Sequence, residues 1–354
     1  MNKQERNPTS SVADEAAVAL RSAAESLPPA AQSSDSAHHA MNPTKARSAQ
    51  PIGVDCRGLV TRFGYVRALD RFNLTVEPGE CVGLVGRNGA GKSTLFRAML
   101  GLGSLDAGTI EFTPRLDRGD LLARTGYVPD TLSIYDWMTV GRALNFAARC
   151  QPRFDSAWTN ELLALLALDR SKSVRALSRG MQARLAFVLG LAHRPDLVLL
   201  DEPLLGVDAI THDIVLEVLA RMRARDGTTV ILATHQPGDL ARLVDRVVFV
   251  ERGRAHTSIA TDDLVDRTKR IVVHGANDGT RLNASCKFSP EAGVLLTRST
   301  EVGATSQLTV TFDGDAHAVE EAIGKIAPEA RISRVDLTIH EACADRLRAL
   351  EVKS

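Results

Sequence analysis

"GRNGAGKST", residues 86–94, is a run of glycines, a lysine and two hydroxyl residues that directly follows the apolar segment "CVGLV". It fits the pattern G-x-x-x-x-G-K-[ST], with Gly86, Gly91, Lys92 and Ser93 at the fixed positions. Glycines let the backbone curl so that successive N–H groups point inward, and the helix that follows presents its positive end to the same point. The stretch predicts a phosphate-binding loop between a buried strand and a helix. A glycine-rich turn without a ligand is the alternative.

Within this loop Lys92 is expected to reach the β- and γ-phosphates of a nucleoside triphosphate, and the Ser93 hydroxyl to ligate magnesium. The candidate nucleotide-binding residues of the loop are Gly86, Arg87, Asn88, Gly89, Ala90, Gly91, Lys92, Ser93 and Thr94. The loop alone indicates a nucleotide binder and does not separate kinases, GTPases, helicases and transport ATPases.

The composition narrows the class of protein. The chain has 354 residues, and its 43 basic side chains balance its 43 acidic ones, so no net charge attracts it to nucleic acid. Only 4% of its residues are aromatic, which argues against recognition of single strands by base stacking. Its five cysteines form no CxxC pair, which indicates free thiols in a reducing compartment. No apolar run approaches the roughly 18 to 20 residues of a bilayer-spanning helix, and no secretory signal is recognisable. We therefore expect a cytoplasmic chain whose membrane role, if it has one, comes through a partner.

Composition and hydrophobic patterning divide the chain into three regions. Residues 1–51 are rich in Ser, Ala, Pro and Asn and are predicted to be disordered, with Met41 as an alternative translation start. Residues 52–264 alternate as in an α/β domain, and about 127–194 of them are mostly helical. Residues 265–354 predict a small α+β appendage whose role is open.

Three short apolar runs predict strands buried on both faces of a parallel sheet, at residues 81–85, 197–200 and 229–233. They end in "GRNG", "DEP" and "THQ". Because ligands bind at the carboxyl ends of parallel strands, these three endings are candidates to share one site.

The second and third endings carry side chains suited to phosphate chemistry. Asp201 is predicted to hold magnesium and Glu202 to orient and deprotonate the attacking water, although Asp-Glu-Pro also suits a helix N-terminus. His235 is predicted to contact the γ-phosphate, with a purely structural histidine as the alternative.

"LSRGMQARLA", residues 177–186, completes a set of five motifs. In this order, over about residues 54–255, the motifs resemble those of the ATP-binding cassette (ABC) ATPases. The resemblance implies an α/β P-loop NTPase fold with a mixed, mainly parallel sheet and a helical subdomain. It also implies ATP and Mg²⁺ as cofactors, Asp201 as the magnesium residue, Glu202 as the catalytic carboxylate and His235 as the switch histidine.

The same resemblance assigns residues that would contact nucleotide away from the loop. Phe63, or alternatively Tyr65, looks like the aromatic that stacks on adenine. Ser178 and Gly180 look like the signature motif, and Asp208 resembles the D-loop aspartate. The signature also precedes a helix that we expect to begin near Met181, whose N-terminus suits an anion. Since the phosphate loop covers the γ-phosphate from one side, this helix would face the nucleotide of a second cassette.

The chain departs from the family pattern in several places. Arg179 and Met181 replace a glycine and a glutamine of the signature, and Leu205 replaces the D-loop serine. Asp130 stands where the Q-loop usually has Gln or Glu, and this shorter carboxylate is expected to bind magnesium through a water molecule.

The leading hypothesis is the ATP-hydrolysing subunit of a transporter, dimerising around two ATP-Mg and lying on the inner face of the membrane through a separate permease. The permease is expected to dock near residues 127–170, where "GYVPDTLSIYDWMTV" resembles bacterial drug- or antibiotic-export cassettes with an ABC-2-like permease. The alternatives are a soluble ABC ATPase acting on ribosomes or DNA, and a nucleotide sensor without turnover. The sequence identifies neither the cargo, nor the direction of transport, nor the permease.

Overall fold

The computed structural model describes residues 50–236, 243–274, 293–302, 305–314, 316–326 and 330–353. The predicted disordered segment, apart from residues 50 and 51, lies outside the described residues, as do Met41 and Cys286. In the described part of the chain, no helix combines the length and the apolarity that a membrane crossing requires.

A six-stranded sheet forms the centre of the protein, in the order β5-β6-β7-β3-β8-β9. The first five strands of this order pair in parallel, and β9 pairs antiparallel with β8. Every residue of β3, β6 and β7 is buried, as their continuous apolarity predicts. The fold is therefore α/β with a mixed, mainly parallel sheet, as expected. The bounds are β3 (Cys81–Val85), β5 (Thr125–Val128), β6 (Leu197–Asp201), β7 (Thr229–Thr234), β8 (Arg246–Glu251) and β9 (Arg254–Ala260).

A second, antiparallel sheet of three strands in the order β2-β1-β4 lies over the first and was not foreseen from the sequence. Its strands are β1 (Gly53–Phe63), β2 (Val66–Val76) and β4 (Ala107–Thr113). Apolar side chains of β1 and β2 share a core with β3 and with helix α2 (Lys92–Met99). This core fixes the phosphate loop, which joins β3 to α2, between the two sheets.

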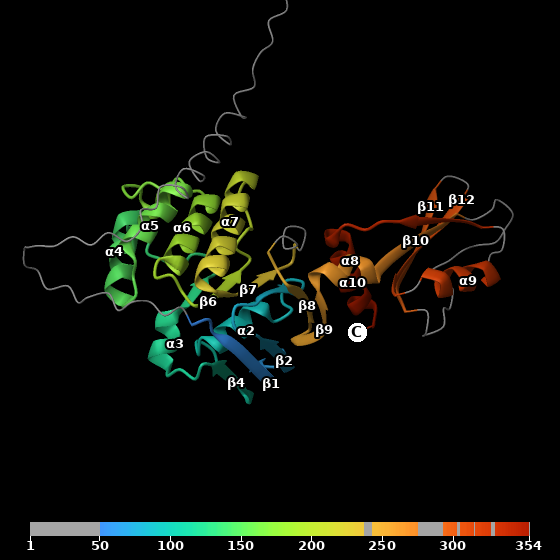
Figure 1. Cartoon of the computed structure of the whole chain (residues 1–354), viewed down its shortest axis with the longest axis horizontal. Coiled ribbons are helices and arrows are strands. Elements are labelled where there is room, and N and C mark those ends of the chain that lie inside the picture. Colours follow the sequence, from blue (N-terminus) through green and yellow to red (C-terminus); the bar gives the residue numbers. More distant parts are fainter. Residues whose placement is uncertain are drawn as a thin grey trace, which may run out of the picture.

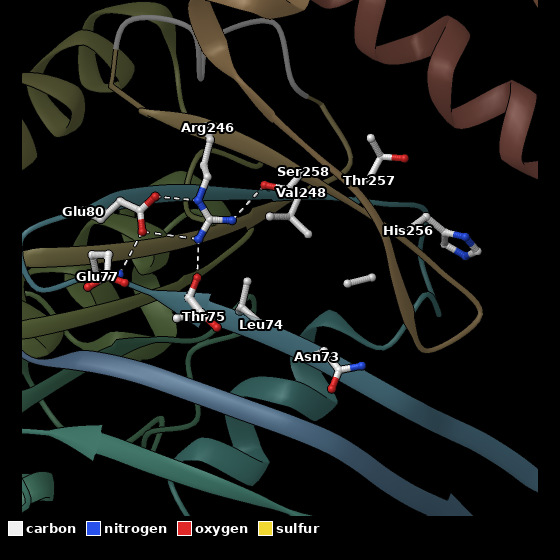
Figure 2. A pocket seen from close by; sticks show the side chains of 11 residues that line it. Asn73, Leu74, Thr75, Glu77, Glu80, Arg246, Val248, His256, Thr257 and Ser258 are labelled. Atoms are coloured by element: carbon white, nitrogen blue, oxygen red, sulfur yellow. Dashed lines mark hydrogen bonds and ion pairs between the residues drawn. The ribbon is translucent and has the colours of Figure 1, made fainter. Parts of the chain in front are cut away.

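Arg246 on β8 ties the antiparallel layer to the central sheet (Figure 2). Its guanidinium donates to Glu80 Oε1 at 2.5 Å, to Ser258 Oγ at 2.9 Å and to the backbone oxygen of Thr75. These bonds satisfy the arginine at the edge of a pocket of about 500 Å³. We read this contact as structural, because one cation here joins three segments of the chain.

Helices gather at one end of the molecule (Figure 1). Side chains that accept from the first turn cap five of them, at Asp117, Thr139, Asp155, Ser178 and Asp208. Because Ser178 caps α6, that helix begins at Arg179, two residues before the expected start. The bounds are α3 (Arg118–Arg124), α4 (Val140–Cys150), α5 (Ser156–Leu165), the short 3₁₀ helix η1 (Val174–Ala176), α6 (Arg179–Leu191) and α7 (Ala209–Asp226).

A third sheet, antiparallel and in the order β11-β12-β10-β13, lies at the opposite end of the molecule (Figure 1). Helix α9 packs on one of its faces through Val319 and Ile323. Helix α10 returns to the central core, where Ala342, Cys343 and Leu347 are buried with residues of β8. The bounds are α8 (Thr261–Arg267), β10 (Thr268–His274), β11 (Val294–Val302), β12 (Thr305–Asp313), α9 (Ala316–Ile326), β13 (Arg331–Val335) and α10 (Ile339–Lys353).

Candidate functional site

The loop after β3 is held in the curled form that its glycines predict. Gly91 has φ of 107°, and a Cβ there would lie 2.5 Å from the backbone oxygen of Ala68 on β2. A Cβ on Gly86 would lie 2.4 Å from the backbone oxygen of Val250. No side chain caps the N-terminus of α2, so its first N–H groups are left for a ligand. The loop is thus shaped by backbone neighbours on two other strands.

Lys92 lies over the start of this loop. Its Nζ donates to the backbone oxygens of Gly86 at 2.6 Å and Arg87 at 3.1 Å, and it lies 3.4 Å from Glu202 Oε1. The other oxygen of Glu202 lies 2.9 Å from His235 Nδ1 and accepts from the His235 backbone N–H at 3.3 Å. The structure therefore brings together the ends of β3, β6 and β7 around one carboxylate.

The backbone of Glu202 explains how adjacent acids reach one site. Glu202 has φ of 50°, which is uncommon for a residue with a side chain, and its N–H donates to Ala233 O at 2.9 Å. The chain thus turns sharply after Asp201, and the Glu202 side chain points toward His235. Strain of this kind is concentrated at functional sites.

Asp201 has the properties of a cation ligand. It is 1% exposed, and neither carboxylate oxygen has a hydrogen-bond partner among the described residues. Burial raises the pKa of its carboxyl, while the Ser93 hydroxyl lowers it and the nearby Asp130 and Glu202 carboxylates raise it further. A buried carboxylate beside a hydroxyl fits Mg²⁺, which prefers hard oxygen ligands. In the described part of the chain no group of three or more His, Cys, Asp or Glu side chains is placed so that all of them could hold one metal ion.

Asp130 and Phe63 lie on two further segments, one near Asp201 and the other beside the phosphate loop. Asp130 follows β5, and its charge acts on Asp201 and on Tyr127. Phe63 ends β1 and is 56% exposed, whereas Tyr65 at the hairpin turn is fully exposed. The same hairpin leads into Ala68, which contacts Gly91, so both aromatics lie on a segment that adjoins the phosphate loop.

Ser178, Gly180 and Asp208 form a second group. A Cβ on Gly180 would lie 3.0 Å from the backbone oxygen of Gly206, so the signature and the D-loop are in close contact. Asp208 caps α7 by accepting from Thr211 N at 3.0 Å, and Arg184 on α6 donates to it at 2.5 Å. The hydrogen bond from the Thr211 N–H lowers the pKa of Asp208 to about 2.

A pocket of about 440 Å³ lies between the two groups, lined by Glu202, Thr234 and Gln236 and by the D-loop residues Leu205 and Gly206. Two contributors to the site were not foreseen from the sequence. Arg184 holds the D-loop, and the Gly253 N–H donates to Ala90 O at 2.8 Å and so supports the phosphate loop. Their partners lie too far away in the sequence for local spacing to reveal them.

These features define a class of protein, the P-loop nucleoside triphosphatases, because a phosphate loop, a buried unpaired aspartate and a glutamate converge at one sheet edge. Comparison with known proteins narrows the class. Residues 69–205 match the family model described as ABC transporter.

The chain is similar to proteins of several transporters. It is 32% identical over 225 residues to the ABC transporter ATP-binding protein YtrB of Bacillus subtilis (strain 168), covering 62% of this chain and 75% of the relative. It is 34% identical over 263 residues to the sulfate/thiosulfate import ATP-binding protein CysA 2 of Chromobacterium violaceum, covering 72% and 71%. The chain therefore belongs to the ATP-binding proteins of ABC transporters, and it is an ATP-binding subunit with ATPase activity.

Solved structures agree with this fold. A structure described as the ATP binding subunit of an ABC transporter matches with a TM-score of 0.54 and 27% identity, over 60% of this chain and 92% of that one. A dimeric ATP-binding cassette, MJ0796 bound to ADP and Pi, matches with a TM-score of 0.53 and 23% identity, over 59% and 98%. The second likeness concerns the fold alone.

Proposed function

We propose that the chain hydrolyses ATP-Mg at the joint end of β3, β6 and β7 and uses the energy to drive a separate membrane permease. The observation that carries the proposal is the position of Glu202, whose two oxygens lie beside Lys92 and His235. A lysine from the phosphate loop, a carboxylate and a histidine around one point are the groups that γ-phosphoryl transfer to water requires.

Each side chain has a defined task in this proposal. The backbone N–H groups of residues 86–94 and Lys92 bind the phosphates, Phe63 stacks on adenine, and His235 contacts the γ-phosphate. Glu202 orients the attacking water and accepts its proton. Because Lys92 and His235 already lie at the two Glu202 oxygens, ATP binding exchanges the Lys92 contact for a phosphate contact and leaves one oxygen for the water.

The magnesium ion belongs beside Asp201. Ser93 and Asp201 would hold it directly, and Asp130, whose charge acts on Asp201, would hold it through water. When bound, the ion neutralises charge that develops on the phosphates. The unpaired, buried oxygens of Asp201 support this assignment, because a buried charge without a partner is costly unless a ligand completes it.

A second copy of the chain completes the site in this proposal. Gly180 lies against Gly206 of the D-loop in its own subunit, and Ser178 caps the same helix two residues earlier. They would cover the ATP bound by the other copy, with Asp208 at the seam. Two cassettes would then enclose two ATP molecules and separate after hydrolysis.

The permease would dock on the helical end of the molecule, near residues 127–170. An apolar groove of about 290 Å³ there is lined by Pro129, Leu132 and Phe154. Tyr135 and Trp137 are 65% and 64% exposed and stack on each other with ring centroids 5.6 Å apart. Exposed aromatics of this kind mark protein interfaces. The resemblance of residues 126–140 to drug-export cassettes makes export the proposed direction, and the relatives include both import and export proteins.

The subunit would thus lie on the cytoplasmic face of the membrane, held by its permease. We also propose that residues 52–264 form the cassette and residues 265–354 a C-terminal unit. The boundary falls within α8, and α10 packs against both α8 and β8.

Replacement of Glu202 by Gln tests the proposed chemistry. The variant keeps the shape of the site but loses the proton acceptor, so ATP binding persists while turnover falls about 10²- to 10⁴-fold and an ATP-bound dimer accumulates. Glu217→Gln, on the exposed face of α7, is the matched control and keeps wild-type turnover. Unchanged hydrolysis by Glu202→Gln would remove Glu202 from its role.

Two further measurements separate the parts of the proposal. Lys92→Ala is expected to weaken ATP binding, which isothermal titration measures, and an unaltered affinity refutes the loop assignment. Membranes of cells that express the tagged chain are expected to release a polytopic protein with it on mild detergent extraction. Recovery of the chain alone would contradict the permease assignment. Equal accumulation of cargo outside cells that carry the wild type and outside cells that carry the inactive Glu202→Gln variant would contradict the exporter assignment.

A further inference from the structure

A pocket of about 460 Å³ lies between the third sheet and α10, away from the ATP site. Strand alternation divides the side chains of this sheet. Val310 and Phe312 pack with α9, whereas Arg270 and Thr311 point to the other face, where both bond to Asp345 of α10. The pocket is therefore formed by the polar face of the sheet and the inner side of one helix.

Both acids that line the pocket are already neutralised by protein groups. Asp345 is 2% exposed and accepts from Arg270 Nη2 at 2.7 Å, from Thr311 Oγ1 at 2.7 Å and from Arg348 Nη1 at 3.2 Å. Glu341 accepts from Thr338 N at 3.0 Å and from Arg270 Nη1 at 3.3 Å. Arg270 therefore pairs with both carboxylates and is not available to a ligand.

Positive charge remains on the opposite wall. Three arginines and two acids line the pocket, so their formal sum is +1. Arg298 on β11 is an exposed residue directly opposite Thr309 on β12, and no ion pair or hydrogen bond of its guanidinium is found among the described residues. Arg348 uses one N–H on Asp345 and is half exposed. A guanidinium with its donors unused suits an oxyanion, which its planar fork binds bidentately.

Beside the charged groups the lining is mixed, with polar side chains from Thr300, Thr309 and His340 and a set of apolar ones. Val272, Leu296 and Val335 come from three strands, and Ala344 comes from α10. Helix α10 is anchored in the central core through Ala342 and Cys343, so the pocket does not depend on a ligand to keep its shape. Its volume falls in the range of about 300 to 1,000 Å³ that is typical of small-molecule sites.

We propose that this pocket binds a small organic anion, with its carboxylate or phosphate on Arg298 and Arg348 and its apolar body against Val272, Leu296 and Val335. The site is separate from the ATP site, and its chemistry follows from an exposed arginine without a protein partner beside three apolar side chains. Carboxylate and phosphate share this recognition, and the experiment below separates them.

The test uses the full chain, labelled at valine and leucine methyl groups, with benzoate and phenyl phosphate as probes followed by NMR. Saturable shifts of the Val272 and Val335 methyl signals are expected, and the tighter probe identifies the head group. Benzyl alcohol has the same ring without the charge and is expected to bind at least about tenfold more weakly, the loss expected when a hydrogen bond to a charged group is missing. Shifts confined to Val85 and Leu95, beside the phosphate loop, would place the probe in the ATP site and overturn the proposal.

Variants of arginine complete the test. Arg298→Ala is expected to weaken probe binding about tenfold to a hundredfold, and Arg298→Lys, which keeps the charge but loses the fork, to fall between it and wild type. Arg331→Ala removes an exposed arginine of the same sheet outside the pocket and keeps wild-type affinity. Equal affinities for Arg298→Ala and wild type, or equal binding of benzyl alcohol and the anions, overturn the proposal. Circular dichroism establishes that each variant is folded.

Discussion

His235 Nδ1 lies 2.9 Å from the Glu202 oxygen that also accepts from the backbone N–H of His235. Lys92 lies 3.4 Å from the other oxygen of the same carboxylate. Glu202 and His235 directly follow β6 and β7, and Lys92 ends the phosphate loop after β3, so the parallel pairing of these strands brings the three residues to one edge of the sheet. The histidine therefore fixes the orientation of the acid before any nucleotide arrives.

Replacement of His235 by Ala follows from this contact. We expect turnover to fall about 10²-fold or more, because Glu202 loses the group that orients it and the γ-phosphate loses a donor. ATP affinity is expected to change little, since Lys92 and the loop remain. Steady-state ATPase assays together with nucleotide titration measure both. His256→Ala, an exposed histidine on β9, is the control, and an equal loss in both variants would contradict the assignment.

Gly91→Ala tests how tightly the phosphate loop is built. An alanine Cβ would lie 2.5 Å from Ala68 O in a backbone conformation, φ of 107°, that favours glycine. We expect ATP binding to be lost and the thermal midpoint of unfolding to fall, because β2 cannot retreat without disturbing the core. Gly103→Ala, whose Cβ has its nearest neighbour at 3.7 Å, keeps binding and stability. Normal nucleotide affinity in Gly91→Ala would show that the loop is free to rearrange.

The sequence predicted the central strands to within one residue at each end. Strands β3, β6 and β7 are buried on both faces, so each leaves a continuous apolar run with a sharp polar end. Strand β2 alternates over Phe72, Leu74 and Val76, which are buried, so this part of the antiparallel layer left a local signal that the sequence analysis missed. Strand β4 has no buried residue, and the pairing of β1 with β2 shifts register at several points. In β4 and β1, solvent exposure and irregular pairing leave too weak an apolar pattern to identify the strand from its local sequence.

The candidate site was likewise predictable from the sequence only in part. The convergence of Lys92, Asp201, Glu202 and His235 was predicted, because strand ends in a parallel sheet share one edge. The φ of 50° at Glu202 and the contact of Lys92 with that acid depend on the neighbouring strand and loop, and no residue pattern encodes them. The bond of Arg184 to Asp208 spans 24 residues and was equally invisible from the sequence.

Asp208→Ala probes the cap that holds the D-loop. At pH 7 we expect the free energy of unfolding to fall by about 1 kcal/mol, the usual loss for an N-cap. The pKa of Asp208 is lowered to about 2 from an ordinary value of 3.8, so its contribution is complete above pH 3.8 and is lost as the pH falls through 2. The difference between wild type and variant in urea unfolding should therefore be smaller at pH 3 than at pH 7. A difference that grows on acidification would contradict this ionisation.

Replacement of Tyr135 and Trp137 together by Ser tests the proposed permease surface. The two rings stack on each other and are mostly exposed, so their loss is expected to leave the fold and the ATPase activity of the isolated subunit unchanged. Binding to the permease should fall about tenfold or more, because buried aromatic anchors carry much of the energy of an interface. The measurement is the amount of polytopic protein recovered with the tagged chain from detergent-solubilised membranes. Leu102→Ser removes an exposed apolar side chain from another face and serves as the control. Undiminished recovery with the double variant would move the permease contact away from the loop between β5 and α4.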